Sequence, residues 1–271
     1  MLHYKVYEAQ QSSDTVLILL HGFISDTSTF DQHIGTLTQS YHVVTVDLPG
    51  HGQDTSDVNQ LWDFQWLSQA LHQVVLKIQK NKTILHGYSM GARVALFYAC
   101  QFPELLNGLI LESGSPGIQK EEQRFERQRI DEARARVLEI APLATFVNDW
   151  EQLPLFQSQR FLSDEERLRI REMRLRQSPN KLAKALRDYG TGAMPSLWNE
   201  LGHLQLPVLL IVGEWDEKFV EIAHQMQEQL LDAQLEIVPS VGHTVHVEDV
   251  TKFDTITLAF MNSLNKEDNH G

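Results

Sequence analysis

Gly87, Ser89 and Gly91 form a Gly-x-Ser-x-Gly pattern between two segments of different character. The apolar run 83–86 before it predicts a short buried strand, and the segment 93–99 after it predicts a helix. A serine at such a corner projects its hydroxyl from the edge of a sheet, and flanking glycines let neighbouring backbone pass closely. The alternative is a serine that caps the helix beside two turn glycines. The strand before it and the helix after it favour a catalytic serine.

Two residues suited to proton transfer follow later strands. A serine hydroxyl reacts only when a histidine takes its proton and an acid orients that histidine. Asp216 comes after the apolar run 208–212, and His243 comes after the run 235–238. In sheets whose catalytic serine stands at such a strand-to-helix turn, here called the serine corner, the chain order is serine, acid, histidine. Each of the three residues lies just past a strand end. The sequence therefore predicts that Ser89, Asp216 and His243 meet at one sheet edge as a catalytic triad.

Other residues near these positions compete for the same roles. Glu214 and Glu217 flank Asp216, but Asp216 follows the end of the predicted strand at the usual distance for the acid of such a triad. His246 forms a His-x-x-His pair with His243, which could indicate a metal site, yet no suitably placed acidic ligand completes one. We therefore predict no metal. Three further polar residues are interpreted as structural hydrogen-bonding partners: Asp47, His51 and His86.

Negative charge that develops on a substrate oxygen needs backbone N–H donors. With a serine corner of this kind they come from the residue after the serine and from the loop after an early strand. Those residues are Met90 and Phe23, the latter following His21 and Gly22. We expect their backbone N–H groups to form an oxyanion hole.

Apolar runs alternate with helical segments along most of the chain, which predicts an α/β fold with a mostly parallel central sheet and helices on both faces. The predicted strands lie at 16–20, 43–47, 84–85, 109–111, 208–212 and 235–238, and the predicted helices at 61–78, 93–101, 219–231 and 250–264. Between 119 and 188 the pattern is helical and charged, without a strand-like run. We therefore divide the chain into residues 1–117 as the first part of the core, 118–190 as an inserted helical lid, and 191–271 as the second part of the core.

Composition limits the classes of partner and compartment. Hydrophobic residues make up 42% of the 271 residues, enough for a sizeable core. A net charge of −13 argues against nucleic-acid and anionic-membrane binding, and no apolar stretch has membrane-spanning length. The single cysteine, Cys100, excludes an internal disulfide, and no secretory leader is visible, so we expect a cytoplasmic protein. No dinucleotide-type glycine loop is present, so no organic cofactor is expected.

The arginines are concentrated in one segment. Twelve of the thirteen lie between Gly117 and Gly190, and the remaining one is Arg93, four positions after Ser89. Guanidinium groups are suited to bidentate recognition of carboxylates or phosphates. The alternative is an arginine-rich solvated helix face with glutamate partners at helical spacing, which accounts for most of the twelve. Two or three arginines that face the serine would suffice for a small anionic substrate.

These motifs resemble the α/β-hydrolase superfamily over nearly the whole chain. More narrowly, the chain is similar to the 2-succinyl-6-hydroxy-2,4-cyclohexadiene-1-carboxylate synthase family, through segments 87–93, 115–119, 126–129, 149–150, 154–156, 213–219 and 242–243. Ala92 departs from the pattern of that family, which favours glycine there, and adds a methyl group at a crowded position.

The resemblance implies a lyase of menaquinone biosynthesis. The family eliminates pyruvate from 2-succinyl-5-enolpyruvyl-6-hydroxy-3-cyclohexene-1-carboxylate, and the triad serine acts as a base on a ring C–H. The substrate carries three carboxylates, for which the resemblance assigns Arg93, Arg127 and Arg174. Neighbouring arginines that could be confused with these are Arg124, Arg129 and Arg176. The resemblance also places three aromatic residues in the pocket, although each could equally pack in the lid or core: Tyr88, Trp150 and Phe156.

Two other functions remain open at this level. A serine hydrolase would use the same triad, with Ser89 acylated by a small anionic ester, thioester or C–C substrate and water completing the cycle. A non-catalytic binding module on the same fold would more naturally have lost Ser89, Asp216 or His243. The sequence leaves monomer and homodimer equally open.

Overall fold

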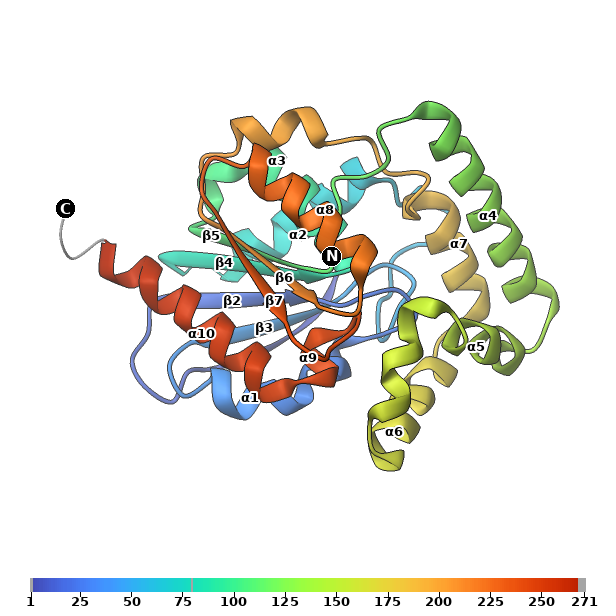
Figure 1. Cartoon of the computed structure of the whole chain (residues 1–271), viewed down its shortest axis with the longest axis horizontal. Coiled ribbons are helices and arrows are strands. Elements are labelled where there is room, and N and C mark those ends of the chain that lie inside the picture. Colours follow the sequence, from blue (N-terminus) through green and yellow to red (C-terminus); the bar gives the residue numbers. More distant parts are fainter. Residues whose placement is uncertain (1, 79, 268–271) are drawn as a thin grey trace.

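The computed structural model describes residues 2–78 and 80–267. Met1, Gln79 and residues 268–271, which belong to the predicted core segments 1–117 and 191–271, lie outside the described residues. The described chain forms a seven-stranded sheet in the order β1-β3-β2-β4-β5-β6-β7 (Figure 1). The strands are β1 (His3–Tyr7), β2 (Thr15–Leu20), β3 (His42–Asp47), β4 (Lys82–Tyr88), β5 (Gly108–Glu112), β6 (Val208–Gly213) and β7 (Ala233–Val238). Only the β1–β3 pairing is antiparallel among these strands, which confirms the mostly parallel sheet.

Helices cover both faces of the sheet because its central strands are apolar on both sides. Along β2, Ile18 and Leu20 pack with α2 (Phe64–Ile78), α3 (Met90–Gln101) and α8 (Glu217–Gln229). The alternate residues Leu17 and Leu19 pack on the other face, against α1 (Asp31–Leu37) and α10 (Val250–Glu267). Side chains alternate along a strand, so a continuous apolar run can supply two cores. Figure 1 shows the two helical layers on opposite sides of the sheet.

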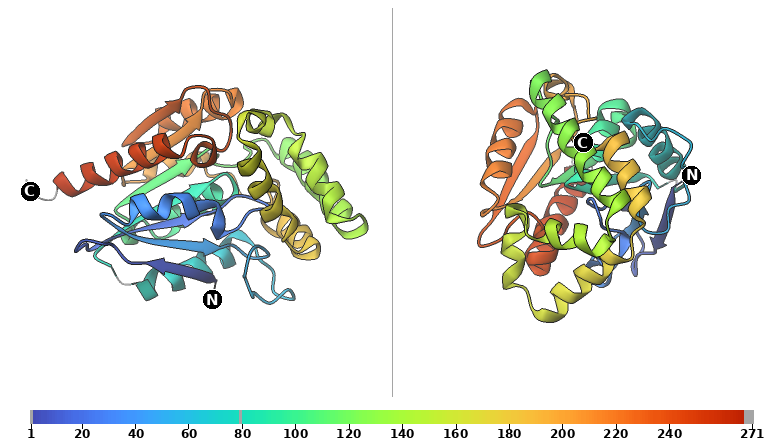
Figure 2. Two further views of the ribbon diagram at one scale, coloured as in Figure 1. Left: turned by 90° about the horizontal axis from the view of Figure 1, so that it is seen from below. Right: turned by 90° about the vertical axis from the view of Figure 1, so that its right-hand side faces the viewer.

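Four helices between β5 and β6 form a separate layer at one end of the sheet (Figures 1 and 2). They are α4 (Glu121–Ile140), α5 (Leu143–Glu151), α6 (Asp164–Leu175) and α7 (Pro179–Tyr189), with the 3₁₀ segment η3 (Pro154–Phe161) between α5 and α6. Leu138, Phe146 and Leu182 belong to a small apolar cluster of this layer. The helical insertion predicted from the sequence is thus present, and it stands over the edge at which the parallel strands end.

The structure adds two elements that the sequence analysis did not predict, the edge strand β1 and the short helix α1. It also shifts some helix boundaries: α2 begins at Phe64 rather than Leu61, because the Asp63 carboxylate accepts a hydrogen bond from the Trp66 amide at 2.8 Å. A further short helix, α9 (Val245–Glu248), follows β7. Among the helices of the described chain, none is long and apolar enough to cross a membrane.

Candidate active site

Ser89 lies on a sharp turn between β4 and α3. Its backbone has φ 51° and ψ −102°, a conformation that non-glycine residues rarely adopt. The two glycines of the motif are sterically required, because a Cβ on Gly87 would lie 2.3 Å from the Gly91 carbonyl oxygen and one on Gly91 would lie 2.4 Å from that of Leu20. Within the described chain the Ser89 side chain makes no capping hydrogen bond to α3. The serine-cap interpretation is therefore wrong, and the hydroxyl is available for another partner.

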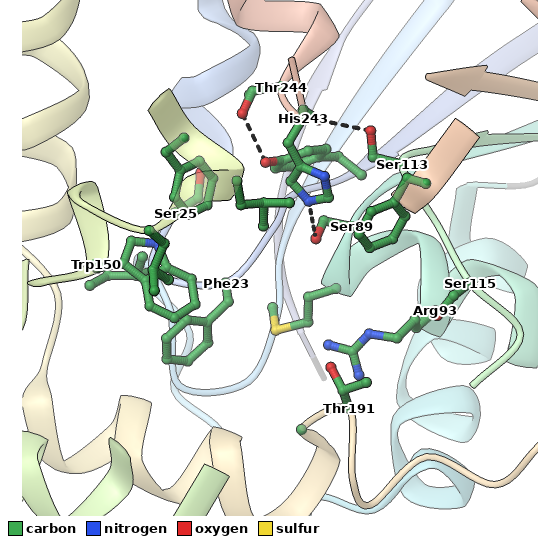
Figure 3. Close-up of a pocket in the computed structure, with 18 of the residues that line it drawn as sticks. Phe23, Ser25, Ser89, Arg93, Ser113, Ser115, Trp150, Thr191, His243 and Thr244 are labelled. Atoms are coloured by element: carbon green, nitrogen blue, oxygen red, sulfur yellow. Dashed lines mark hydrogen bonds between the residues drawn. The ribbon is translucent and has the colours of Figure 1, made fainter. Parts of the chain in front are cut away.

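Ser89, His243 and Asp216 form one hydrogen-bonded line. His243 Nε2 lies 2.9 Å from Ser89 Oγ (Figure 3). His243 Nδ1 lies 2.5 Å from Asp216 Oδ2. With the carboxylate accepting from Nδ1–H, Nε2 is left to accept the serine proton. His243 and Asp216 are both buried, so little water competes for these bonds. This geometry can activate a serine oxygen either as a base or as a nucleophile.

The competing residues have other partners. Glu214 accepts a hydrogen bond from the Ser240 amide at 2.9 Å, and Glu217 is exposed at the start of α8. His246 lies below the site, with Nδ1 2.8 Å from Glu112 Oε1. Among the described residues no cluster of three or more histidine, cysteine or acidic side chains is arranged to hold a metal ion.

The residues interpreted as structural make local hydrogen bonds. Asp47 accepts from the Thr27 amide at 2.9 Å and from the Gln53 amide at 3.1 Å. His51 Nδ1 lies 3.1 Å from the Pro49 carbonyl oxygen, and His86 Nε2 lies 3.2 Å from a Glu112 oxygen.

Ala92 is accommodated beside the turn although it adds a methyl group. The residue opposite it is Gly114, where a Cβ would lie 2.8 Å from that of Ala92. The methyl group therefore occupies space that is free because Gly114 has no side chain. Ala92 is buried there, beside the turn.

A cavity of about 370 Å³ opens above Ser89 between the sheet edge and the helical layer (Figure 3). Phe23 and Met90 both line it together with Ser89. Met90 is the first residue of α3, where backbone N–H groups have no partner within the helix. The cavity lining brings together residues of the core and of α4 to α7, so a bound molecule would touch both.

Arg93 reaches this cavity from the first turn of α3. Its guanidinium donates to the Tyr189 carbonyl oxygen at 3.2 Å and makes no ion pair within the described chain. Burial, reinforced by the nearby charge of Arg127, lowers the pKa of Arg93 to about 10. An anionic ligand would relieve this unfavourable burial of charge.

The two arginines assigned from the helical layer also line the cavity, but each has an acidic partner. Arg127 Nε donates to Asp131 Oδ1 at 2.8 Å. Arg174 donates to Glu151 Oε1 and to Gln159 Oε1, both at 3.2 Å, and burial lowers its pKa. These partners fix the guanidinium groups and neutralise part of their charge.

The remaining arginines divide between the cavity and the surface. Arg129 and Arg176 pair with Glu126 and Asp26 instead of lining the cavity, and Arg124 does not line it either. Two cations that the sequence analysis did not single out do line it, Arg134 and Lys218. The helical spacing of Arg134 from Arg127, two turns along α4, could have placed it on the same face.

Three aromatic side chains predicted for the pocket lie in its wall. The Tyr88 hydroxyl is 3.0 Å from Thr244 Oγ1, and burial raises the pKa of Tyr88. The Trp150 ring lies 5.1 Å from that of Phe23 and 5.7 Å from that of Phe156. The cavity lining thus combines aromatic side chains with the cations Arg93, Arg127 and Arg174.

The fold and the serine corner define an α/β hydrolase. The model of the family described as "Alpha/beta hydrolase family" matches residues 17–253.

Individual relatives narrow this class. The solved structure of MenH from S. aureus is 49% identical, superimposes with a TM-score of 0.96 and covers 98% of this chain and 100% of its own. A Bacillus subtilis protein named "Putative 2-succinyl-6-hydroxy-2,4-cyclohexadiene-1-carboxylate synthase" is 35% identical over 97% of this chain and 96% of its own length. The 2-succinyl-6-hydroxy-2,4-cyclohexadiene-1-carboxylate synthase of Escherichia coli O1:K1 is 34% identical over 86% of this chain and 88% of its own. The chain therefore belongs to this synthase family within the α/β hydrolases.

Proposed function

We propose that the chain eliminates pyruvate from 2-succinyl-5-enolpyruvyl-6-hydroxy-3-cyclohexene-1-carboxylate and so forms 2-succinyl-6-hydroxy-2,4-cyclohexadiene-1-carboxylate, in menaquinone biosynthesis. The product is the compound for which the relatives are named. The observation that carries the proposal is the buried guanidinium of Arg93, which has no ion pair in the described chain and lines the same cavity as the hydrogen-bonded pair of Ser89 and His243. A neutral ester would gain nothing from that charge, whereas a tricarboxylate would.

Ser89 acts in this proposal as a base. His243 Nε2 takes the hydroxyl proton, Asp216 stabilises the imidazolium that forms, and Ser89 Oγ removes a proton from a ring carbon. The C–H electrons form a double bond to the neighbouring ring carbon, and the existing ring double bond shifts one position toward the carbon that carries the enolpyruvyl group. The C–O bond at that carbon breaks, and the enolate of pyruvate leaves. That enolate takes up a proton and becomes pyruvate. The N–H groups of Phe23 and Met90 stabilise negative charge on substrate oxygen during proton removal.

The arginines hold the substrate carboxylates over Ser89. Arg93 belongs to the core, while Arg127 and Arg174 belong to α4 and α6 of the helical insertion. A substrate held by both parts would bring the insertion and the core together. We therefore propose that residues 118–190 work as a lid over the two halves of the core, 1–117 and 191–271.

The aromatic wall complements this arrangement. Tyr88, Trp150 and Phe156 give the ring of the substrate an apolar surface and keep water from the serine. We further propose that the enzyme works in the cytoplasm, because Cys100 is the single cysteine of the sequence and leaves no internal disulfide to form.

Product analysis tests the proposal. The purified chain is incubated with the enolpyruvyl substrate, and pyruvate is measured with a coupled dehydrogenase, beside hydrolysis of p-nitrophenyl esters. We expect rapid pyruvate release with negligible ester turnover. Ser89→Ala and His243→Ala should each lower pyruvate release by about 10³-fold or more while the protein stays folded.

The opposite pattern would identify a serine hydrolase. Fast ester hydrolysis without pyruvate release would contradict the lyase proposal and would leave the triad in place. Near-normal pyruvate release by Ser89→Ala would instead contradict the role of Ser89.

A further inference from the structure

Glu112 connects the serine corner with the loop that carries His243. It is the last residue of β5 and is completely buried. Its backbone carbonyl accepts a hydrogen bond from the Ser89 amide at 2.8 Å. Its carboxylate accepts from the backbone amide of His246 at 3.0 Å and from Nδ1 of the same residue at 2.8 Å. One residue therefore holds both the serine and the segment three positions after His243.

Ser113 extends this connection by one residue. Its hydroxyl donates to the His243 carbonyl oxygen at 2.8 Å, and Figure 3 shows Ser113 and Ser89 each joined to His243 by a dashed line. The Ser113 backbone has φ 48°, in the left-handed region that side chains rarely adopt. Because of this turn, the Ser113 side chain points toward the loop that carries His243, although Ser113 comes directly after β5.

The hydrogen bonds around Glu112 define its charge. The carboxylate receives three N–H donors, two from His246 and one from His86 Nε2 at 3.2 Å. Burial alone would raise the pKa of Glu112, but His246 and His86 hold it well below its usual range. Burial lowers the pKa of His246, and its Nε2 lies 2.9 Å from the Thr29 hydroxyl oxygen. The carboxylate is thus a fixed, fully satisfied anion under the site.

Tyr88 completes the connection between this cluster and the site. Its ring centroid lies 4.8 Å from that of His246 and 5.4 Å from that of His243. A displacement of His246 would consequently be felt by His243 through both the loop backbone and the Tyr88 ring, because packed interiors transmit strain.

We propose that Glu112, assisted by Ser113, is a positioning residue that sets the distance between Ser89 Oγ and His243 Nε2. The inference rests on the proposed roles of Ser89 and His243. It gives a function to the buried pair of Glu112 and His246, which the catalytic mechanism does not use. Glu112 touches no substrate and transfers no proton. It acts by fixing the end of β5, the serine corner and the loop that carries His243 relative to one another.

The test uses a reaction that needs only the Ser89–His243 pair. Ser89 is labelled with an excess of a fluorophosphonate: Ser89 Oγ bonds to phosphorus, fluoride leaves, and His243 takes the proton. In Glu112→Gln one carboxylate oxygen becomes N–H₂, which cannot accept from His246 or His86, so the hold of this residue on the loop is weakened. We expect labelling and kcat to fall by about 10²-fold, as for a 1 Å misplacement, with KM unchanged.

Asp254→Asn is the matched control. Asp254 is also buried and accepts from His33 Nδ1 at 2.7 Å, but this pair joins α1 to α10 and not to the histidine loop. It should lose thermal stability as Glu112→Gln does, while labelling stays close to that of the wild type. If Glu112→Gln does not fold, Ser113→Ala removes a single hydrogen bond and keeps a side chain at the same φ, and it should slow labelling about 10-fold.

Several outcomes would overturn the inference. Wild-type labelling rates in a folded Glu112→Gln, or in Ser113→Ala where Glu112→Gln does not fold, would show that neither residue aligns the pair. Equal slowing in Asp254→Asn would reduce the effect to general stability. A wild-type chain that the probe does not label would remove the premise that His243 activates Ser89. A wild-type chain that is labelled but releases no pyruvate would contradict only the proposed reaction.

Discussion

Arg93 differs from the other cavity arginines in its counter-charge. Arg127 is paired with Asp131 and Arg174 with Glu151, whereas Arg93 contacts only a backbone carbonyl as a hydrogen-bond acceptor in the described chain. A buried cation without a carboxylate partner has the most to gain from a substrate carboxylate. Arg93 is therefore the residue at which the proposed substrate should be recognised most strongly.

Replacing Arg93 measures this contribution. Arg93→Ala should lower kcat/KM for pyruvate release by about 10- to 100-fold, the effect of losing a charge-assisted hydrogen bond of roughly 1.5–3 kcal/mol. Arg136→Ala is the control, because Arg136 is exposed and, among the described residues, its ion pair is with Glu132. Similar effects of the two changes would mean that Arg93 does not contact a substrate carboxylate directly.

Site residues differ in how far the sequence could predict them. Ser89, Asp216 and His243 each follow a strand, and parallel strands end at one edge, so their proximity follows from the pattern of strands. The inward direction of Arg134 and the role of Glu112 depend on side-chain packing between elements, which spacing along the chain does not contain. Glu112 reads in the sequence as the polar end of an apolar strand.

The serine corner is the element on which the site depends, and its glycines can be tested separately from the chemistry. Gly91→Ala places a Cβ 2.4 Å from the Leu20 carbonyl oxygen and 2.7 Å from that of His21, both backbone atoms that cannot move independently of β2. We expect a loss of about 1–3 kcal/mol in the free energy of unfolding, as in overpacked interiors, together with loss of pyruvate release.

Gly35→Ala provides the comparison for this change. Gly35 lies exposed inside α1, and a Cβ there meets nothing within 4 Å. The change should stabilise the protein by about 0.5–1 kcal/mol and leave turnover intact, because alanine favours helix more than glycine. Urea denaturation of both variants checks the pair, and a Gly91→Ala protein as stable and active as the wild type would refute the steric argument.

The elements missed by the sequence analysis are those with little burial or length. β1 is an edge strand with no fully buried residue, so its five residues show no apolar alternation. α1 has seven residues and follows a 3₁₀ turn capped by Asp26, so no amphipathic period develops. The buried parallel strands carried a strong apolar signal because both of their faces are covered.

At the scale of the whole molecule, buried histidines couple stability to pH. Burial lowers the pKa of His21, His51 and His246, and for His51 the value falls to about 3. Below pH 6.5 the unfolded chain binds more protons at these histidines than the folded chain does, so the free energy of unfolding must fall as the pH falls.

Denaturation at two pH values tests this coupling. Between pH 7 and pH 5, His51 alone should contribute a loss of about 2 kcal/mol in the free energy of unfolding. His51→Gln removes the titrating group, and its stability should depend less on pH by about that amount, even if it is less stable at pH 7. An identical pH dependence in both proteins would mean that His51 takes up a proton in the folded state.

The central claim is that Ser89 removes a ring proton as pyruvate leaves. Its most direct test is the single-turnover rate of pyruvate release with substrate carrying deuterium at that ring carbon, because a single turnover isolates chemistry from product release. We predict slower release from the deuterated substrate than from the protiated one, with no covalent adduct on Ser89. Equal rates for the two substrates, with an acyl group trapped on Ser89, would contradict the role of Ser89 as a base.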